Sequence, residues 1–487
     1  MSEQLISTVT EPTRTGLRRN LSVWQAVGLS VALMAPSMAA NINPQQTAVA
    51  AGRAVPLAFF LSAIGVLLVA YGFVRLCQYY QHAGSVYAFV GRTLGTRAGV
   101  VSGIGLLGTY TFYAVVTASA AGNLGTAFLQ ETGIWPNPPK DGPFVLVAVA
   151  LVGAWLLAVT PAKRGTSILL SIEGVTVAVI LLVTVIIAVR LIGGTGPAGQ
   201  HFTTSVFSFT SDVGMSGVFL GAVFGFLSFA GFEAAATLGE ETQDAKRNIP
   251  RAILGTALFG GVFFVVVTAI EMMAFGTDAK AVGQFKNSSS LLGDLGTGYI
   301  GSWVGDVISL GAAISAFGCC LACVVGGSRL LYALSRDTVG DRGIGRLSRR
   351  GTPAGSVSVV AGIAAGIVLL SVFAFGATAT DTFAWSGSIG TLIILVIYLL
   401  TTIGAIRLVF IQRRMSVPMW QVIFPIGGIG LLGYTVYVNL VPYPTTGPAK
   451  WFPVVSGGIL VLATVVVLAA PALARRMAGR LAETEQA

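Results

Sequence analysis

Long apolar stretches alternate with short polar connections along almost the whole chain. A helix needs about 20 mostly apolar residues to cross a bilayer, so each stretch of that length is a candidate span. Twelve such stretches lie at about residues 22–43, 54–77, 99–129, 143–160, 166–192, 216–239, 251–276, 302–335, 355–377, 381–406, 418–441 and 451–474. The pattern predicts an all-α integral membrane protein with twelve transmembrane helices.

The composition narrows the class further. Hydrophobic residues make up 54% of the 487 residues and charged residues 10%, and the mean hydropathy is +0.82. Soluble domains carry about 25% charged residues, so this composition excludes a water-soluble globular protein.

The positive charges predict the orientation. The net charge is +10, and 22 of the 29 Lys and Arg residues fall in connections on the side of the N-terminus, against six on the other side. Because positive residues accumulate on the cytoplasmic side, we expect a multi-pass protein of the cell membrane with both termini in the cytoplasm. The basic charge then reflects orientation in the lipid bilayer, and nucleic acid is not expected as a partner.

The first span contains a proline where a regular helix does not tolerate one. Met34, Ala35, Pro36 and Ser37 lie in its middle. Proline removes a backbone donor and clashes with the preceding turn, so the helix must kink or unwind there. Unwound backbone persists at membrane depth only where it lines a cavity or is buried in protein. A simple proline kink packed against its neighbours is the alternative.

The sixth span is interrupted in a similar way. Gly217, Gly221 and Gly225 recur every four residues and favour a close helix crossing. The sequence FAGFE then follows at 229–233, where a glycine precedes the carboxylate of Glu233. An ionisable group within a span usually faces a pathway, a partner or a cavity. The alternative for Glu233 is a protonated or hydrogen-bonded helix-packing residue.

The two interruptions lie five spans apart. Breaks at corresponding positions of two halves indicate an inverted-repeat transporter with a binding site near the midplane. The expected organisation is an N-terminal tail (1–21), a first repeat of spans 1–5 (22–192), an outer connection (193–215), a second repeat of spans 6–10 (216–407), spans 11 and 12 (408–474) and a C-terminal tail (475–487).

Three stretches resemble the amino acid–polyamine–organocation transporter superfamily, in particular its bacterial amino-acid permeases. They are Arg75-Leu76-Cys77 with QHAGSVYAFVGRTLG (81–95), FAGFE (229–233) with GEETQDAKRNIPRAI (239–253), and RLLYALSRD (329–337). The resemblance implies a leucine-transporter type of fold, in which broken helices 1 and 6 bind the substrate. It implies substrate-binding residues Met34, Ala35, Pro36, Ser37, Phe229, Ala230, Gly231 and Phe232. The substrate carboxylate would meet exposed amides of Ala35 to Ser37, and its ammonium would meet free carbonyls of Phe229 to Gly231.

Two carboxylates are candidates for coupling transport to a proton. Glu233 is favoured, and Glu173 in the fifth span either shuttles a proton or pairs with an inner arginine. A sodium site, with oxygens from Ser309 and Ser315, is the alternative to proton coupling. No cofactor or metal is expected. Glu271 lies near an outer membrane edge and is expected to be solvated.

The favoured function is secondary active uptake of amino acids by alternating access. Within transport, the alternatives are an amine or polyamine carrier and an amino acid–product exchanger. A channel or a membrane enzyme is disfavoured, because the sequence offers neither a filter-like pore segment nor a hydrolase motif. The protein is expected to act as a monomer or a homodimer.

Overall fold

The computed structural model describes residues 22–80, 85–160, 163–238, 242–338, 343–348, 352–472 and 475–476. The expected N-terminal tail, most of the C-terminal tail and parts of two resembling motifs (81–84 and 239–241) lie outside the described residues. Within the described ranges the regular elements are helices, and no strand occurs. The α-helices are α1 Val23–Met34, α2 Pro36–Ala51, α3 Val55–Tyr79, α4 Ser85–Leu94, α5 Thr96–Glu131, α6 Pro143–Val159, α7 Lys163–Ile192, α8 Gly214–Ser228, α9 Ala245–Phe275, α10 Ala279–Lys286, α11 Leu291–Tyr299, α12 Ser302–Thr338, α13 Ala354–Phe375, α14 Ala379–Ile406, α15 Ile423–Leu440 and α16 Trp451–Ala469.

The helices agree with a multi-pass membrane protein. Nine helical stretches in the described residues are long and apolar enough to cross a bilayer, and α6 and α8 are shorter apolar helices. One of the nine, Val23–Tyr79, contains α1, α2 and α3 and therefore covers two of the expected spans. The sixth expected span differs most from its helix, since α8 ends at Ser228 and not near residue 239.

Three helices lie between the expected spans. α4 precedes α5, while α10 and α11 fall in the long connection 277–301. Asp278 begins α10 by accepting a hydrogen bond from the N–H of Ala281 at 2.6 Å. Ser288 donates to Asp294 at 2.6 Å in the turn before α11. Burial raises the pKa of Asp294 above its usual value.

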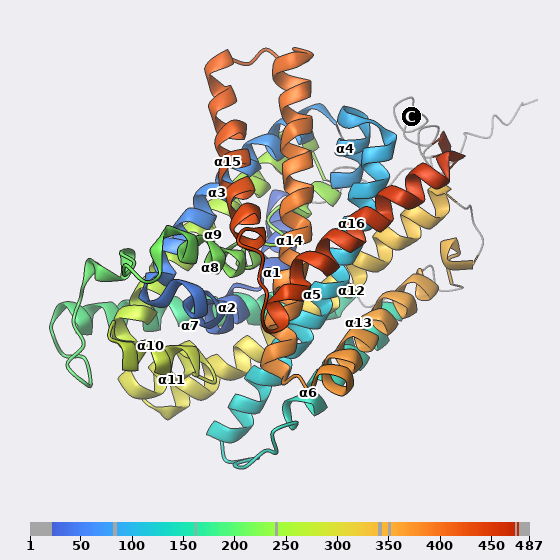
Figure 1. Ribbon diagram of the computed structural model, residues 1–487. Coiled ribbons are helices and arrows are strands. Elements are labelled where there is room, and N and C mark those ends of the chain that lie inside the picture. Colours follow the sequence, from blue (N-terminus) through green and yellow to red (C-terminus); the bar gives the residue numbers. More distant parts are fainter. Residues whose placement is uncertain are drawn as a thin grey trace, which may run out of the picture.

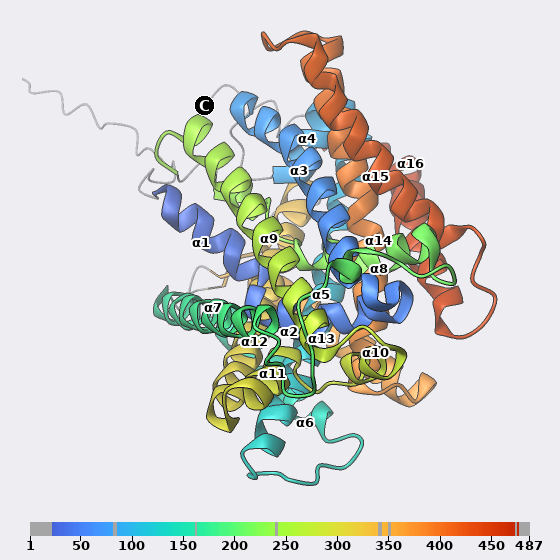
Figure 2. The same cartoon turned by 90° about the vertical axis from the view of Figure 1, so that its left-hand side faces the viewer.

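The long helix α5 runs through the middle of the molecule and packs against α12, α14 and α6 (Figure 1). The connection after α14 and the helix α4 lie at one end of the bundle, and the turn between α5 and α6 lies at the other end (Figure 1). Figure 2 shows α10 and α11 beside α2, toward that second end.

The glycine stripe of α8 permits the close crossing that the sequence predicts. A Cβ atom on Gly217 would lie 2.8 Å from the carbonyl of Ala50, and one on Gly221 would lie 2.8 Å from that of Thr47. The Thr47 hydroxyl donates to the Gly221 carbonyl at 3.1 Å, which ties α2 to α8. Small residues therefore hold α8 directly against α2, the helix that follows the first break.

Candidate substrate site

The first break separates α1 from α2 at a single residue. Ser22 caps α1 by accepting from the N–H of Gln25, whose side chain bonds back to the Ser22 N–H. α1 ends at Met34, Ala35 adopts a left-handed conformation (φ 43°, ψ 60°), and α2 begins at Pro36. Because proline lacks an N–H and disfavours the helical conformation in the residue before it, α1 cannot continue through this point. At this break one helix ends and a separate helix begins.

Side chains from two other helices bind the first amides of α2. The N–H of Ser37 donates to Oε1 of Glu173 in α7 at 2.9 Å. The N–H of Met38 donates to Oγ of Ser315 in α12 at 3.3 Å. The neighbouring donors bond to backbone carbonyls, Ala35 to Val31 at 3.0 Å and Ala39 to Ala35 at 2.9 Å. The expectation of exposed amides from Ala35 to Ser37 is therefore wrong for this conformation.

The second break is wider than the first. After α8, residues 229–233 form an irregular turn, and a short 3-10 helix follows at Ala234–Leu238. Gly231 has φ +100°, a conformation that side-chain-bearing residues rarely adopt. The carbonyl of Phe229 accepts from the N–H of Phe232 at 3.1 Å, and that of Gly231 accepts from Ala234 at 2.9 Å. These two carbonyls are consequently not free, contrary to the expectation, although each oxygen retains a second lone pair.

The two breaks touch each other. A Cβ atom on Gly231 would lie 2.5 Å from the Cβ atom of Leu33, so only a glycine fits against the end of α1. Ser30 of α1 bridges the second break, since its hydroxyl donates to the Phe232 carbonyl at 3.2 Å and accepts from the Ala235 N–H at 3.0 Å. The last turns of α1 are thereby fixed to the irregular segment.

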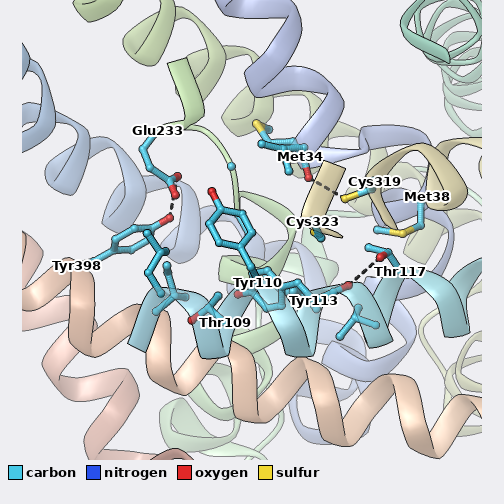
Figure 3. Close-up of a pocket in the computed structure, with 17 residues that line it drawn as sticks. Met34, Met38, Thr109, Tyr110, Tyr113, Thr117, Glu233, Cys319, Cys323 and Tyr398 are labelled. Atoms are coloured by element: carbon cyan, nitrogen blue, oxygen red, sulfur yellow. Dashed lines mark hydrogen bonds between the residues drawn. The ribbon is translucent and has the colours of Figure 1, made fainter. Parts of the chain in front are cut away.

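A cavity of about 30 Å³ lies between the breaks and helices α5, α12 and α14 (Figure 3). A volume of this size holds about two water molecules. Its walls are formed by Leu33, Met34, Met38, Leu106, Thr109, Tyr110, Tyr113, Val116, Thr117, Leu227, Ala230, Gly231, Glu233, Cys319, Cys323, Ile394 and Tyr398.

Some of the residues expected to bind substrate line this cavity. They are Met34, Ala230 and Gly231, and the expected proton carrier Glu233 joins them. The other five are buried next to it. Ala35, Pro36 and Ser37 form the junction of α1 and α2. Phe229 packs edge-on against Phe264 of α9 with ring centroids 5.4 Å apart, and Phe232 packs against Phe73 of α3 at 5.6 Å.

Glu233 is the only acidic residue among those that line the cavity. The Tyr398 hydroxyl of α14 donates to its Oε2 at 2.9 Å. In Figure 3, Glu233 and Tyr398 lie on one side of the cavity, Met34 and Cys319 lie on the other, and the ring of Tyr110 projects between them. The carboxylate therefore keeps one neutral hydrogen-bond donor while it faces an otherwise mainly apolar space.

The remaining buried carboxylates behave differently from one another. Glu173 is bound to the first break through the amide of Ser37, a partner that neither sequence interpretation had named. Glu271 of α9 is fully buried, and its two carboxylate oxygens have no hydrogen-bond partner among the described residues. The expectation that Glu271 is solvated is therefore wrong, because the part of α9 near the outer edge is covered by other helices.

The sequence interpretation missed the walls contributed by α5, α12 and α14. Tyr110 and Tyr113 come from an apolar run in which no position stands out, and Tyr398 lies in a similar run. Cys319 and Cys323 of α12 also line the cavity. All four cysteines of the chain are free and buried. A helical face that lines a cavity is not distinguishable by spacing alone from one that packs in a core.

Comparison with known proteins identifies the family. The sequence profile described as amino acid permease matches residues 42–471. The chain belongs to the amino acid permease family. It is 30% identical over 340 residues to the branched-chain amino acid permease BcaP of Lactococcus lactis, a match that covers 67% of this chain and 70% of the relative. It is 28% identical over 329 residues to the low-affinity putrescine importer PlaP of Escherichia coli, covering 67% and 69%. The branched-chain amino acid permease BcaP of Bacillus subtilis is 27% identical over 306 residues, covering 60% and 61%.

This membership confirms the resemblance seen in the sequence. The protein is a multi-pass membrane transporter of amino acids or amines, and it is not an enzyme. Its all-helical structure agrees with that class.

Proposed function

We propose that this permease carries a small substrate bearing an amino group into the cell across the plasma membrane, by secondary active transport. The substrate is bound in the cavity between the two helix breaks. One observation carries the proposal: both interruptions, which are remote in sequence, meet at Gly231 and Leu33 on the wall of one buried cavity. Irregular backbone at membrane depth is tolerated where it serves such a cavity.

The size of this cavity supports alternating access. At about 30 Å³ it holds about two water molecules, which are fewer non-hydrogen atoms than any amino acid contains. The surrounding helices must therefore move apart for a substrate to enter. The break at Gly231, which joins α8 to the next segment through irregular backbone, is the proposed hinge.

We favour proton coupling through Glu233. The carboxylate faces the cavity and holds a neutral tyrosine hydroxyl, so both its charged and its protonated form find a partner there. Sodium coupling is the alternative, since the hydrogen bonds of the two hydroxyls considered for it leave oxygen lone pairs available. Ser315 accepts from the Met38 N–H, and Ser309 donates to Glu131 at 3.3 Å.

The proposed architecture is that of twelve transmembrane helices in two inverted repeats, 22–192 and 216–407, followed by two further helices within 408–474. The broken segments α1–α2 and α8 with its 3-10 helix begin the two repeats, which agrees with this division. Both termini lie in the cytoplasm in this arrangement, and a monomer or a homodimer is the assembly to test.

An amine carrier is the second candidate. Two features favour it: the single charged side chain on the cavity wall is the acid Glu233, and one relative in the comparison is a putrescine importer. A cationic amine can pair with this carboxylate. A single carboxylate matches a monoamine better than a diamine.

The proposal is tested with a pair of glycine substitutions. Gly231→Leu places a side chain at φ +100° and against Leu33, whereas Gly255→Leu adds the same side chain to the exposed face of α9, where no atom lies within 4 Å of the new Cβ. In proteoliposomes, with a panel of labelled amino acids and amines, we expect Gly231→Leu to abolish uptake and Gly255→Leu to retain it. Wild-type uptake rates in a correctly inserted Gly231→Leu variant would reject the site.

A further inference from the structure

The N-terminal end of α2 holds an anion that the chain itself supplies. The first amides of a helix attract negative charge, because their N–H groups lack partners within the helix and the helix dipole is positive there. Here the carboxylate of Glu173, a residue 136 positions away in sequence, accepts from the Ser37 N–H at 2.9 Å. Its side chain is 4% exposed. The anion-binding end of the helix is thus already occupied.

The surroundings of Glu173 form a built polar site. Ser315 of α12 accepts from the next amide, that of Met38, at 3.3 Å. The hydroxyl oxygen of Ser37 is buried and has no hydrogen-bond partner within the described part of the chain. The carboxylate of α7 and the hydroxyl of α12 therefore bind consecutive amides at the start of α2.

The adjoining cavity offers a charged partner to a cation and none to an anion. Glu233 lines it, while neither Glu173 nor Ser37 does. None of the described residues on its wall is Lys, Arg or His. A substrate ammonium group finds an acid in this cavity. A substrate carboxylate finds no cation, and the helix end that would bind it is filled by Glu173.

We propose that Glu173 is a tethered anion that occupies the N-terminal end of α2, so that the site selects its substrate by the cationic amine and discriminates against a free carboxylate. The substrate class is then a primary amine with an apolar body, which contacts the tyrosine, methionine and cysteine side chains of the wall. An α-amino acid binds only by displacing Glu173 from the Ser37 amide. This inference rests on the proposed function, because it assumes that the cavity is the substrate site.

The test compares ligands that differ only in the carboxylate. Dissociation constants are measured on the purified full-length protein for three pairs: leucine and 3-methylbutylamine, phenylalanine and 2-phenylethylamine, ornithine and putrescine. For wild type we expect the amine of a pair to bind more tightly than the amino acid. Glu173→Ala frees the Ser37 amide, and we expect it to shift the ratio of the two constants toward the amino acid by at least about tenfold, the effect of one hydrogen bond to a charged group.

Two further variants serve as controls for Glu173→Ala. Glu173→Gln preserves the size of the side chain and a weaker acceptor, so it should shift the ratio less than Glu173→Ala. Glu271→Ala removes another buried carboxylate of the spans but frees no amide, and it should leave the ratio unchanged. If Glu173→Gln and Glu173→Ala both keep the wild-type ratio within about twofold, the inference is overturned while the site stands. Wild-type preference for the amino acid overturns it as well. If no pair binds wild type, the inference fails together with the proposed function.

Discussion

The two helix breaks differ in how their backbone groups are satisfied. The first is one residue long, and side chains from α7 and α12 bind the amides that follow it. The second spans five irregular residues, and its own backbone supplies most of the hydrogen bonds, with Ser30 as a bridge from α1. The amides that follow the first bind buried carboxylate and hydroxyl groups. Both breaks contribute to the cavity wall, the first through Met34 and the second through Ala230 and Gly231. Similar interruptions in two spans are therefore satisfied in different ways, one as a polar junction and one as part of the wall of the proposed binding cavity.

Among substitutions that test the difference between the two breaks, we expect the largest effect on uptake from Glu233→Gln, at the second break. The glutamine keeps the shape and still accepts from Tyr398, but it cannot bind or release a proton. We expect uptake to fall and its dependence on external pH to disappear, measured in proteoliposomes across a range of imposed pH gradients.

The control for Glu233→Gln is Tyr398→Phe, which removes the hydrogen-bond donor and leaves the acid. This variant should retain a pH-dependent uptake. The other ionisable side chains on the cavity wall are Tyr110, Tyr113, Cys319 and Cys323. An unchanged pH profile in Glu233→Gln would show that a different group carries the proton.

A smaller effect is expected where α1 is fixed to the second break. Ser30→Ala leaves the Phe232 carbonyl and the Ala235 amide without their buried partner. Each unsatisfied buried group costs about 1–3 kcal/mol, so for the two groups we expect a loss of about 2–6 kcal/mol in stability, detected as a lower Tm in detergent. Ser371→Ala is the matched control, since the Ser371 hydroxyl donates only to the carbonyl of Ile367 in its own helix. Equal Tm values for the two variants would contradict the bridging role of Ser30.

The buried carboxylates provide the next comparison. Glu173 binds a backbone amide at the first break, whereas Glu271 has no partner among the described residues. Replacing Glu271 by methionine removes an unsatisfied polar group and keeps an unbranched side chain, so we expect a gain of about 1–3 kcal/mol. Glu173→Met should instead lower stability, because it leaves the Ser37 amide unpaired. The paired Tm values measure both effects, and a loss of stability in Glu271→Met would indicate a partner for that carboxylate.

Local sequence was sufficient to predict the helical class and the positions of both breaks. Pro36 and Gly231 interrupt the helix within one turn of their own positions. This is predictable because a missing N–H and a positive φ are properties of single residues. A close crossing of α8 was likewise predictable from the spacing of Gly217 and Gly221, whereas its partner α2 was not.

The partners across the breaks were not predictable in the same way. Glu173 and Ser37 are 136 positions apart, and nothing in either local sequence selects the other. Tyr398 and Tyr110 lie in apolar helices whose cavity-facing side depends on how those helices pack. Glu271 was misassigned for a related reason: its position near the end of an apolar stretch indicates membrane depth but does not reveal which helices cover it.

The smallest expected effect concerns Ala35, the single residue of the first break. Its φ of 43° is a left-handed conformation that costs a side-chain-bearing residue about 1–2 kcal/mol. Ala35→Gly relieves this strain, but it also loosens the unfolded chain by about 0.5–1 kcal/mol and removes a buried methyl group worth about 0.8 kcal/mol. We therefore expect a net change below about 1 kcal/mol and near wild-type uptake. Ala35→Val, a β-branched residue at the same φ, should lower the Tm clearly. Because the first break is a polar junction that already tolerates a Cβ atom, a large loss of uptake in Ala35→Gly would contradict this interpretation of the first break.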